Sequence, residues 1–196
     1  AIKKIWNDTL HLLYPHICMG CGSDILARES QLCARCFVNL PVTGFSRHAN
    51  NPIEKYFWGR IPVTAAHAHF YFGKGLVVQQ LNHQLKYKNN KAVGIFLGEL
   101  MGRELADSIR FHGIDALIPL PRFPDKERKR GYNQAAIICN GMSSVMNVPV
   151  ITGNLIRRRY TETQTKKHRV ERWENVDGSF EVKDPTLFKN KHLLLV

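Results

Sequence analysis

Four cysteines near the start of the chain form two pairs that could hold a metal ion. Two residues separate Cys18 from Cys21 and Cys33 from Cys36, and eleven residues lie between the pairs. This spacing lets both sulfur atoms of a pair turn toward one point, so the two pairs can supply four thiolates to tetrahedral Zn2+, as in a zinc ribbon or knuckle. Such a closed site is structural, because no position stays open for water. Two disulfides or a reduced, metal-free cluster are the alternatives.

A basic triplet further along the chain could contact phosphate groups. Arg128, Lys129 and Arg130 precede Gly131, which is predicted to open a helix that Asn133 caps. A guanidinium group can hold a phosphate through two parallel hydrogen bonds, and glycine lets the backbone approach a ligand closely. We therefore expect contact with a phosphate or a nucleic acid. The alternative is a solvated loop before a capped helix.

A second basic segment lies within the polar stretch 154–175. Basic residues with an aromatic ring among them suit single-stranded nucleic acid, because the charges follow the phosphates and the ring stacks on a base. The alternative is a charged surface loop. The candidate nucleic-acid-binding residues are Arg157, Arg158, Arg159, Tyr160, Lys166, Lys167 and Arg169.

The overall charge agrees with an anionic partner. The chain of 196 residues carries 28 lysines and arginines against 16 acidic residues, a net charge of +12. Such an excess favours nucleic acid, a phosphorylated substrate or anionic lipid, although a basic solvated surface would also produce it. No apolar run is long enough to cross a membrane. Zinc-type cysteines without an export signal predict the reducing cytoplasm.

The elements that must position these residues predict an α/β protein. Residues 1–52 are expected to form a helix, the four-cysteine module and a linker, and residues 53–196 a domain in which strands alternate with helices around a mostly parallel sheet. The predicted helices cover residues 76–87, 92–111 and 133–146, and the predicted strands cover residues 65–72, 115–121, 148–151, 178–182 and 192–196.

The order of the motifs resembles that of the ComF family of competence proteins, also described as amidophosphoribosyltransferase-like. The resemblance covers essentially the whole chain, and its most specific element is Arg-Lys-Arg-Gly-Tyr-Asn-Gln at 128–134. It implies a type I phosphoribosyltransferase fold that binds phosphoribosyl pyrophosphate (PRPP) with Mg2+. It also implies a role in natural transformation, with single-stranded DNA and a helicase-like protein as partners. The motifs, after the cysteine pairs, are Pro119-Leu-Pro121, Arg128–Gln134, Arg157-Arg-Arg-Tyr-Thr161 with Gln164, and Arg172 with Asn175-Val-Asp-Gly-Ser-Phe180.

The resemblance also implies roles for particular residues. The segment 119–122 would be the pyrophosphate loop. The alternative, a rigid connection between a strand and a loop, has equal weight, because two prolines remove amide donors that a pyrophosphate loop would use. The stretch 157–169 would be a flap over the site. The family's phosphate loop, two acids before Thr-Thr-Gly-x-Thr, is expected directly after Val196, so the chain is expected to be truncated and to bind PRPP and Mg2+ poorly. The implied PRPP-binding residues are Pro119, Pro121, Arg122, Arg128, Arg130 and Gly131.

Three hypotheses for the function follow. The first is a competence-type protein that binds single-stranded DNA during uptake, with PRPP as ligand or regulator. The second is a phosphoribosyltransferase of nucleotide or cofactor metabolism, and the third is a zinc-dependent scaffold for a helicase partner. No catalytic residue can be assigned. We expect the protein in the cytoplasm, where its partners could bring it to the inner membrane.

Overall fold

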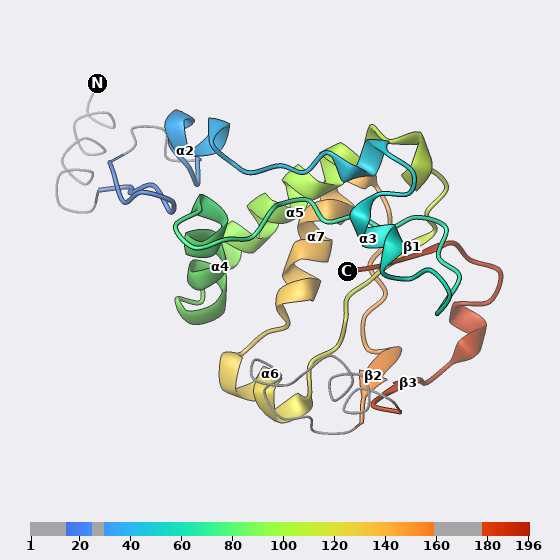
Figure 1. Cartoon of the computed structure of the whole chain (residues 1–196). Helices are drawn as coiled ribbons and strands as arrows, with labels where there is room; N and C mark the ends of the chain where they lie inside the picture. The colour runs from blue at the N-terminus through green and yellow to red at the C-terminus, as the bar shows by residue number, and fades with distance from the viewer. Residues whose placement is uncertain (1–14, 25–29, 159–177) are drawn as a thin grey trace. The chain divides into compact units, whose positions relative to one another are not determined.

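The computed structural model describes residues 15–24, 30–158 and 178–196 (Figure 1). The chain forms two compact units, Ala1–Val93 and Gly94–Val196, which are described one at a time. The helix predicted at the start of the chain lies almost wholly outside the described residues. The module boundary predicted after residue 52 stays a prediction.

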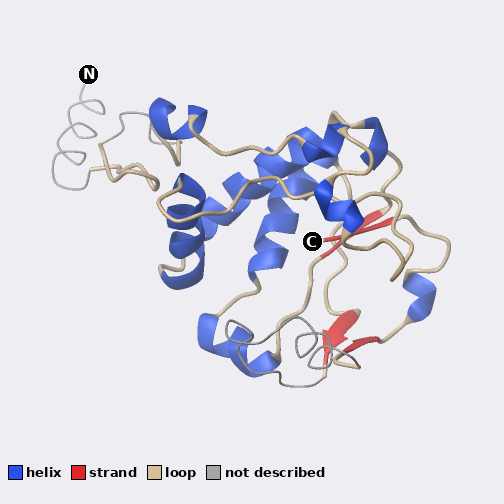
Figure 2. Ribbon diagram, in the orientation of Figure 1, coloured by secondary structure: helices blue, strands red, loops and turns tan. Residues whose placement is uncertain are grey.

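Unit 1 consists of short helices joined by long loops (Figure 2). Leu81 and Leu85 lie four residues apart on the last of these helices and are both buried, as expected for one face of an amphipathic helix. This confirms the helix predicted at 76–87. The elements are α2 (Ala34–Val38), a 3-10 turn (Phe45–Arg47), α3 (Pro52–Lys55) and α4 (Val77–Tyr87).

The strand predicted at 65–72 does not form. Among the described residues, the segment makes one isolated antiparallel bridge, between Phe70 and Val42. Part of its backbone bonds to side chains instead of a second strand, because the amide of Ala66 donates to Glu54 Oε1 at 3.1 Å. The alternation of residue types therefore predicted a strand, but it could not show whether another segment would pair along its length.

The described residues of unit 2 form α5 from Gly94 onward, two further helices and four short strands. Glycines let α5 and α7 approach closely (Figure 1): a Cβ on Gly98 would lie 2.1 Å from the carbonyl oxygen of Ile138, and one on Gly141 would lie 2.2 Å from that of Ile95. The elements are α5 (Lys91–Ala106), a 3-10 turn (Ile109–Phe111), β1 (Ala116–Ile118), α6 (Pro124–Arg130), α7 (Gln134–Met146), β2 (Leu155–Arg157), β3 (Phe180–Val182), a 3-10 turn (Pro185–Leu187) and β4 (Leu193–Leu195).

Three parallel segments lie side by side in unit 2. β4 pairs with β1 in parallel, and on the other side of β1 Val150 makes a parallel bridge with Leu117. β1 is wholly buried. The strand predicted at 192–196 forms as β4; Leu195 in it is 58% exposed, and among the described residues β4 pairs on one side alone. The predicted combination of helices with a small sheet that has parallel strands is confirmed.

A second small sheet is antiparallel. β2 pairs with β3, and β2 falls in the polar stretch 154–175, where no strand was predicted. Asn154, just before β2, is joined to Asp184, just after β3. The side-chain amide of Asn154 donates to the Asp184 carbonyl at 3.0 Å, and its side-chain oxygen accepts from the Asp184 amide at 2.9 Å. Across the described parts of both units, no helix combines the length and the apolar character that crossing a bilayer requires.

Candidate functional site

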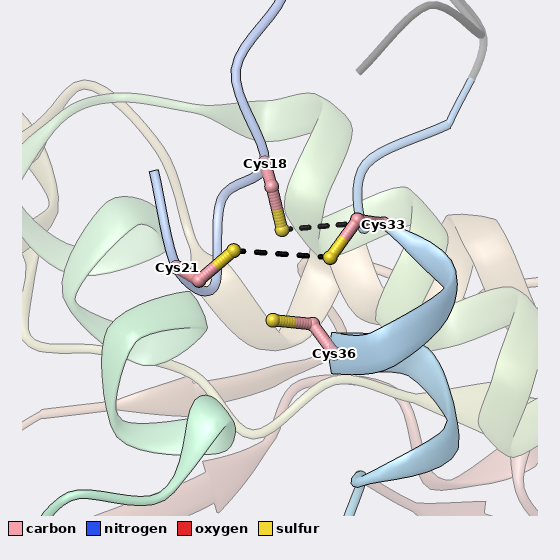
Figure 3. Close-up of side chains that lie close together, drawn as sticks. All are labelled: Cys18, Cys21, Cys33 and Cys36. Atoms are coloured by element: carbon pink, nitrogen blue, oxygen red, sulfur yellow. Dashed lines mark hydrogen bonds between the residues drawn. The ribbon is translucent and has the colours of Figure 1, made fainter. Parts of the chain in front are cut away.

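The four paired cysteines converge on one point in unit 1 (Figure 3). Their sulfur atoms all lie within 4.8 Å of one another, and the Sγ atoms of Cys21 and Cys33 are 3.8 Å apart. In a tetrahedral site with Zn–S bonds of about 2.3 Å, two sulfurs are separated by about 3.8 Å. The cluster could therefore hold a metal ion, and its geometry is compatible with zinc.

Local backbone structure positions these sulfurs. Cys33 immediately precedes α2, so Cys36 follows one helical turn later and returns to the same side. The sulfur of Cys18 accepts hydrogen bonds from the amides of Cys33 at 3.3 Å and Gly20 at 3.4 Å, which stabilise a thiolate. A Cβ on Gly20 would lie 3.0 Å from Cys36 Sγ, so glycine leaves room for the cluster.

The thiols of the cluster differ in acidity. Hydrogen bonding from Ser23 lowers the pKa of the exposed Cys21 thiol to about 6, whereas burial and the neighbouring thiols raise the pKa of Cys36. None of the five cysteines forms a disulfide. The predicted pairs therefore meet as free thiols, and the fifth cysteine, Cys139, is buried apart from them on α7 in unit 2.

A cavity of about 890 Å3 lies in unit 2 where the parallel segments end. Pro119 and Pro121 follow β1, and Thr152 and Gly153 follow the segment of Val150; all four line the cavity. In open α/β sheets, ligands bind outside the carboxyl ends of the strands, where chain connections diverge to opposite sides. Such a point lies at β1, which is the middle segment of the three. The chain leaves β1 for the segment of Val150 on one side and later returns to β4 on the other side.

Three arginines concentrate positive charge beside this cavity. Arg122 donates to Gln134 Oε1 at 3.3 Å, and Arg130 donates to the same oxygen. Burial lowers the pKa of Arg122, and the positive charges of Arg130 and Arg157 lower it further. Arg157 lies above the ring of Phe180, at 5.3 Å from its centroid. Such a group of guanidinium ions is suited to an anionic ligand, which relieves their mutual repulsion.

Two further arginines of the site are paired with acids. Arg128 lines the cavity and forms an ion pair with Asp125. Arg158 also lines it and forms an ion pair with Glu181, which includes a hydrogen bond of 2.7 Å from Nη2 to Oε1. Both guanidinium groups are exposed, so these pairs can open at little cost when an anion competes.

The basic triplet has a different setting from the predicted one. Arg128 and Arg130 lie on α6, a helix that the sequence did not predict, and Gly131 ends α6 with a φ of 83° instead of opening a helix. Asn133 does cap α7, since its side chain accepts from the amide of Ala135. Outside the described residues are Arg159, Tyr160, Lys166, Lys167 and Arg169.

Some lining residues were missed by the sequence reasoning. Lys183 follows β3 and adds a cation, and its position after a predicted strand was the available signal. Tyr132 and Ile137 line the cavity with apolar surface from α7 and the turn before it. Asn133 also donates to the carbonyl of Leu120 at 3.0 Å and so joins the loop after β1 to the start of α7.

Comparison with known proteins supports the resemblance that the motifs indicated. No family model matches the chain. Competence protein F of Haemophilus influenzae is 23% identical over 178 residues, covering 89% of this chain and 73% of that protein. DNA utilization protein YhgH of Escherichia coli K12 is 24% identical, covering 97% of this chain and 82% of that protein, and YhgH of Shigella flexneri has the same values. These relatives are competence and DNA utilization proteins. The resemblance to ComF-type competence proteins is thereby confirmed.

Proposed function

We propose that this protein acts in DNA uptake and that the cavity of unit 2 binds the phosphate groups of its ligands. The names of the relatives support the role, and the convergence of Arg122, Arg130 and Arg157 beside the cavity carries the assignment of the site. The four-cysteine cluster is proposed to hold one structural Zn2+ that stabilises unit 1.

Single-stranded DNA is the first proposed ligand. Arg157 and Arg158 were predicted to bind nucleic acid, and Arg122 and Arg128 were predicted to bind pyrophosphate; all four line one cavity. Phosphates of a DNA strand and free pyrophosphate are therefore expected to compete for the same guanidinium groups. Because the contacts are ionic, the affinity for DNA should fall steeply with salt, with a slope near −0.7 in log affinity against log salt for each phosphate bound.

PRPP is the second proposed ligand of this cavity, and tight binding is expected of a chain that carries the predicted phosphate loop. The volume of about 890 Å3 lies within the usual range for small-molecule sites, about 300–1,000 Å3, and Tyr132, Ile137 and Leu155 supply apolar walls. A phosphorylated sugar with Mg2+ fits a cationic site at the carboxyl ends of parallel strands. The type I phosphoribosyltransferase fold is proposed on the same grounds.

The test measures DNA binding in matched variants. Fluorescence anisotropy of a labelled oligo(dT) strand is compared among the wild type, Arg122→Ala and Arg103→Ala. Arg103 is exposed on α5, away from the cavity lining, and carries the same charge. Arg122→Ala is expected to weaken binding about tenfold and to flatten the salt slope, and pyrophosphate should displace the strand better than NaCl of equal ionic strength. Equal losses in both variants would mean that the cavity is not the site.

Transferase activity is the second candidate function, favoured by a cavity of small-molecule size. Incubation with PRPP, Mg2+ and a set of purine and pyrimidine bases, followed by measurement of released pyrophosphate, tests it. Release that depends on one base and is lost in Arg122→Ala would favour the enzyme. No release, together with DNA binding, would favour the binding role. The helicase-like partner and the place at the inner face of the membrane stay predictions.

A further inference from the structure

Two exposed aromatic side chains project from one turn of unit 1. Tyr56 and Trp58 lie at and just after the end of α3 and are 60% and 58% exposed. Folded proteins usually bury most of such large rings, because each carries a large apolar area. Two of them on a single turn therefore mark a binding surface more strongly than scattered exposed aliphatic residues do.

Cations accompany these rings. Lys55 Nζ lies 5.9 Å from the centroid of the Trp58 ring, within range of a cation–π contact, and Arg60 Nη1 donates to the carbonyl of Tyr56 at 3.1 Å. From residue 44 to residue 64 the sequence holds a single acid, Glu54, which is buried and accepts hydrogen bonds. The exposed charge of this segment is therefore positive.

A buried polar hub holds the turn in place. The two N–H groups of the Asn51 side chain are shared among four oxygens at 2.8 to 3.3 Å, the carbonyls of Phe45, His48 and Ala66 and Oε1 of Glu54. Its oxygen accepts from the first amides of α3. The turn itself is closed by backbone bonds, including one of 3.0 Å from the Arg60 amide to the Phe57 carbonyl. The rings therefore project from a fixed backbone, which lowers the entropic cost of binding.

We infer that Lys55, Tyr56, Trp58 and Arg60, named here the Trp58 platform, bind single-stranded nucleic acid by stacking bases on the two rings while the two cations contact the backbone phosphates. Exposed rings interleaved with cations are the usual means of sequence-tolerant single-strand binding. The inference rests on the proposed role in DNA uptake, and it adds a second contact region, in unit 1, to the phosphate site of unit 2.

Two other occupants fit the platform less well. Proteins that lie on a lipid surface usually use a long amphipathic helix, whereas α3 has four residues. In a symmetric dimer formed through this face, the cations of one copy would face the same cations of the other copy, and these like charges would repel. Nucleic acid supplies both the negative charge and the flat apolar faces.

The test uses the full chain, with a labelled oligo(dT) strand and with inorganic polyphosphate, which has the charge but no bases. Trp58→Ala is expected to weaken oligo(dT) binding about tenfold, as for loss of one stacked base, and Trp58→Phe to retain most of the affinity. Because the ring is neutral, the salt slope should not change, whereas Arg60→Ala should flatten it by about 0.7. Polyphosphate binding should be the same in Trp58→Ala and in the wild type.

Tyr87→Ala is the matched control, since Tyr87 is another exposed aromatic residue of unit 1 and lies outside the platform. An equal loss in this variant, or wild-type affinity in Trp58→Ala, would overturn the platform but leave the proposed DNA binding intact. A wild-type chain that fails to bind oligo(dT) would overturn both. If the wild-type chain binds anionic phospholipid vesicles but not oligo(dT), and Trp58→Ala abolishes this binding, the platform is a membrane contact. If the chain dimerises with rising concentration and Trp58→Ala abolishes dimerisation, the platform contacts a second copy.

Discussion

The side chain of Arg122 is tied to Gln134, twelve positions later, by a hydrogen bond of 3.3 Å from Nη1 to Oε1. The same oxygen accepts from Arg130, so one neutral amide holds two guanidinium groups together. This connects the loop after β1 with the end of α6 and the first turn of α7. Gln134 is thereby placed to position the arginines for an anion without contributing charge itself.

Gln134→Leu should therefore weaken anion binding while leaving the net charge unchanged. Without the shared acceptor, Arg122 and Arg130 lose their fixed arrangement, and we expect a threefold to tenfold weaker affinity for pyrophosphate, or about 1 kcal/mol. Titration calorimetry on the full chain measures it. Asn140→Ala, an exposed change on the same helix, is the control. An unchanged affinity in Gln134→Leu would show that the arginines need no positioning.

Removal of one cluster cysteine should release the metal. A small module cannot bury enough apolar surface alone, so metal binding and folding of the first part of unit 1 are expected to be coupled. Metal analysis should find about one zinc per chain in the wild type and little in Cys18→Ser. Cys139→Ala, which removes the cysteine outside the cluster, should retain the metal. Purified protein with two disulfides and no metal would contradict the proposal.

The fifth cysteine should be chemically silent in the folded protein. Burial raises the pKa of the Cys139 thiol to about 12, so only about one in ten thousand is ionised at pH 8, and only the thiolate reacts readily with alkylating reagents. Its ionisation, and so its reactivity, should rise as the pH approaches 12. Mass spectrometry after native alkylation at pH 8 should find Cys139 unmodified and then modified after unfolding. Rapid alkylation of Cys139 in the native protein would contradict this prediction and show that α7 opens to solvent.

A methyl group at the crossing of α5 and α7 should destabilise unit 2. A Cβ on Gly98 would lie 2.1 Å from the Ile138 carbonyl oxygen, and because that contact is with backbone, the helices must separate. We expect Gly98→Ala to lower the free energy of unfolding by about 3 kcal/mol, although alanine is the better helix former. Urea denaturation measures it. Asn140→Ala, exposed on α7, should change stability by less than about 0.5 kcal/mol.

Loss of the Asn51 side chain should destabilise unit 1. Its oxygen caps α3, a contribution of about 1 kcal/mol, and its amide satisfies buried acceptors that alanine would leave without a partner, at a further cost of about 1–3 kcal/mol. Thermal unfolding should show a clear decrease for Asn51→Ala. Lys55→Ala on the same helix is exposed and should have little effect. Equal melting temperatures would mean that the hub is not structural.

Local patterns allowed the sequence to predict much of this protein. The spacing of Cys18, Cys21, Cys33 and Cys36 predicted the metal cluster, because two residues between ligands suffice to turn both sulfurs toward one ion. The periodicity of residues 76–87 and the cap at Asn133 predicted α4 and α7, since helix signals lie within a few residues of one another. The apolar run at 115–121 likewise predicted β1, which is buried.

Tertiary structure decided what depends on distant partners. The segment 65–72 pairs with residues 41–43 through a single bridge, which is too short for a ladder, and β2 formed within a polar stretch because β3 lies beside it. The approach of Arg157 to Arg122, 35 positions away, results from the parallel order of the strands and from the β2–β3 pair, neither of which is encoded in a local pattern. Residue types therefore predicted the chemistry of each basic segment, whereas only the folded chain joined Arg122 and Arg157 at one cavity, because pairing between remote segments sets which side chains meet.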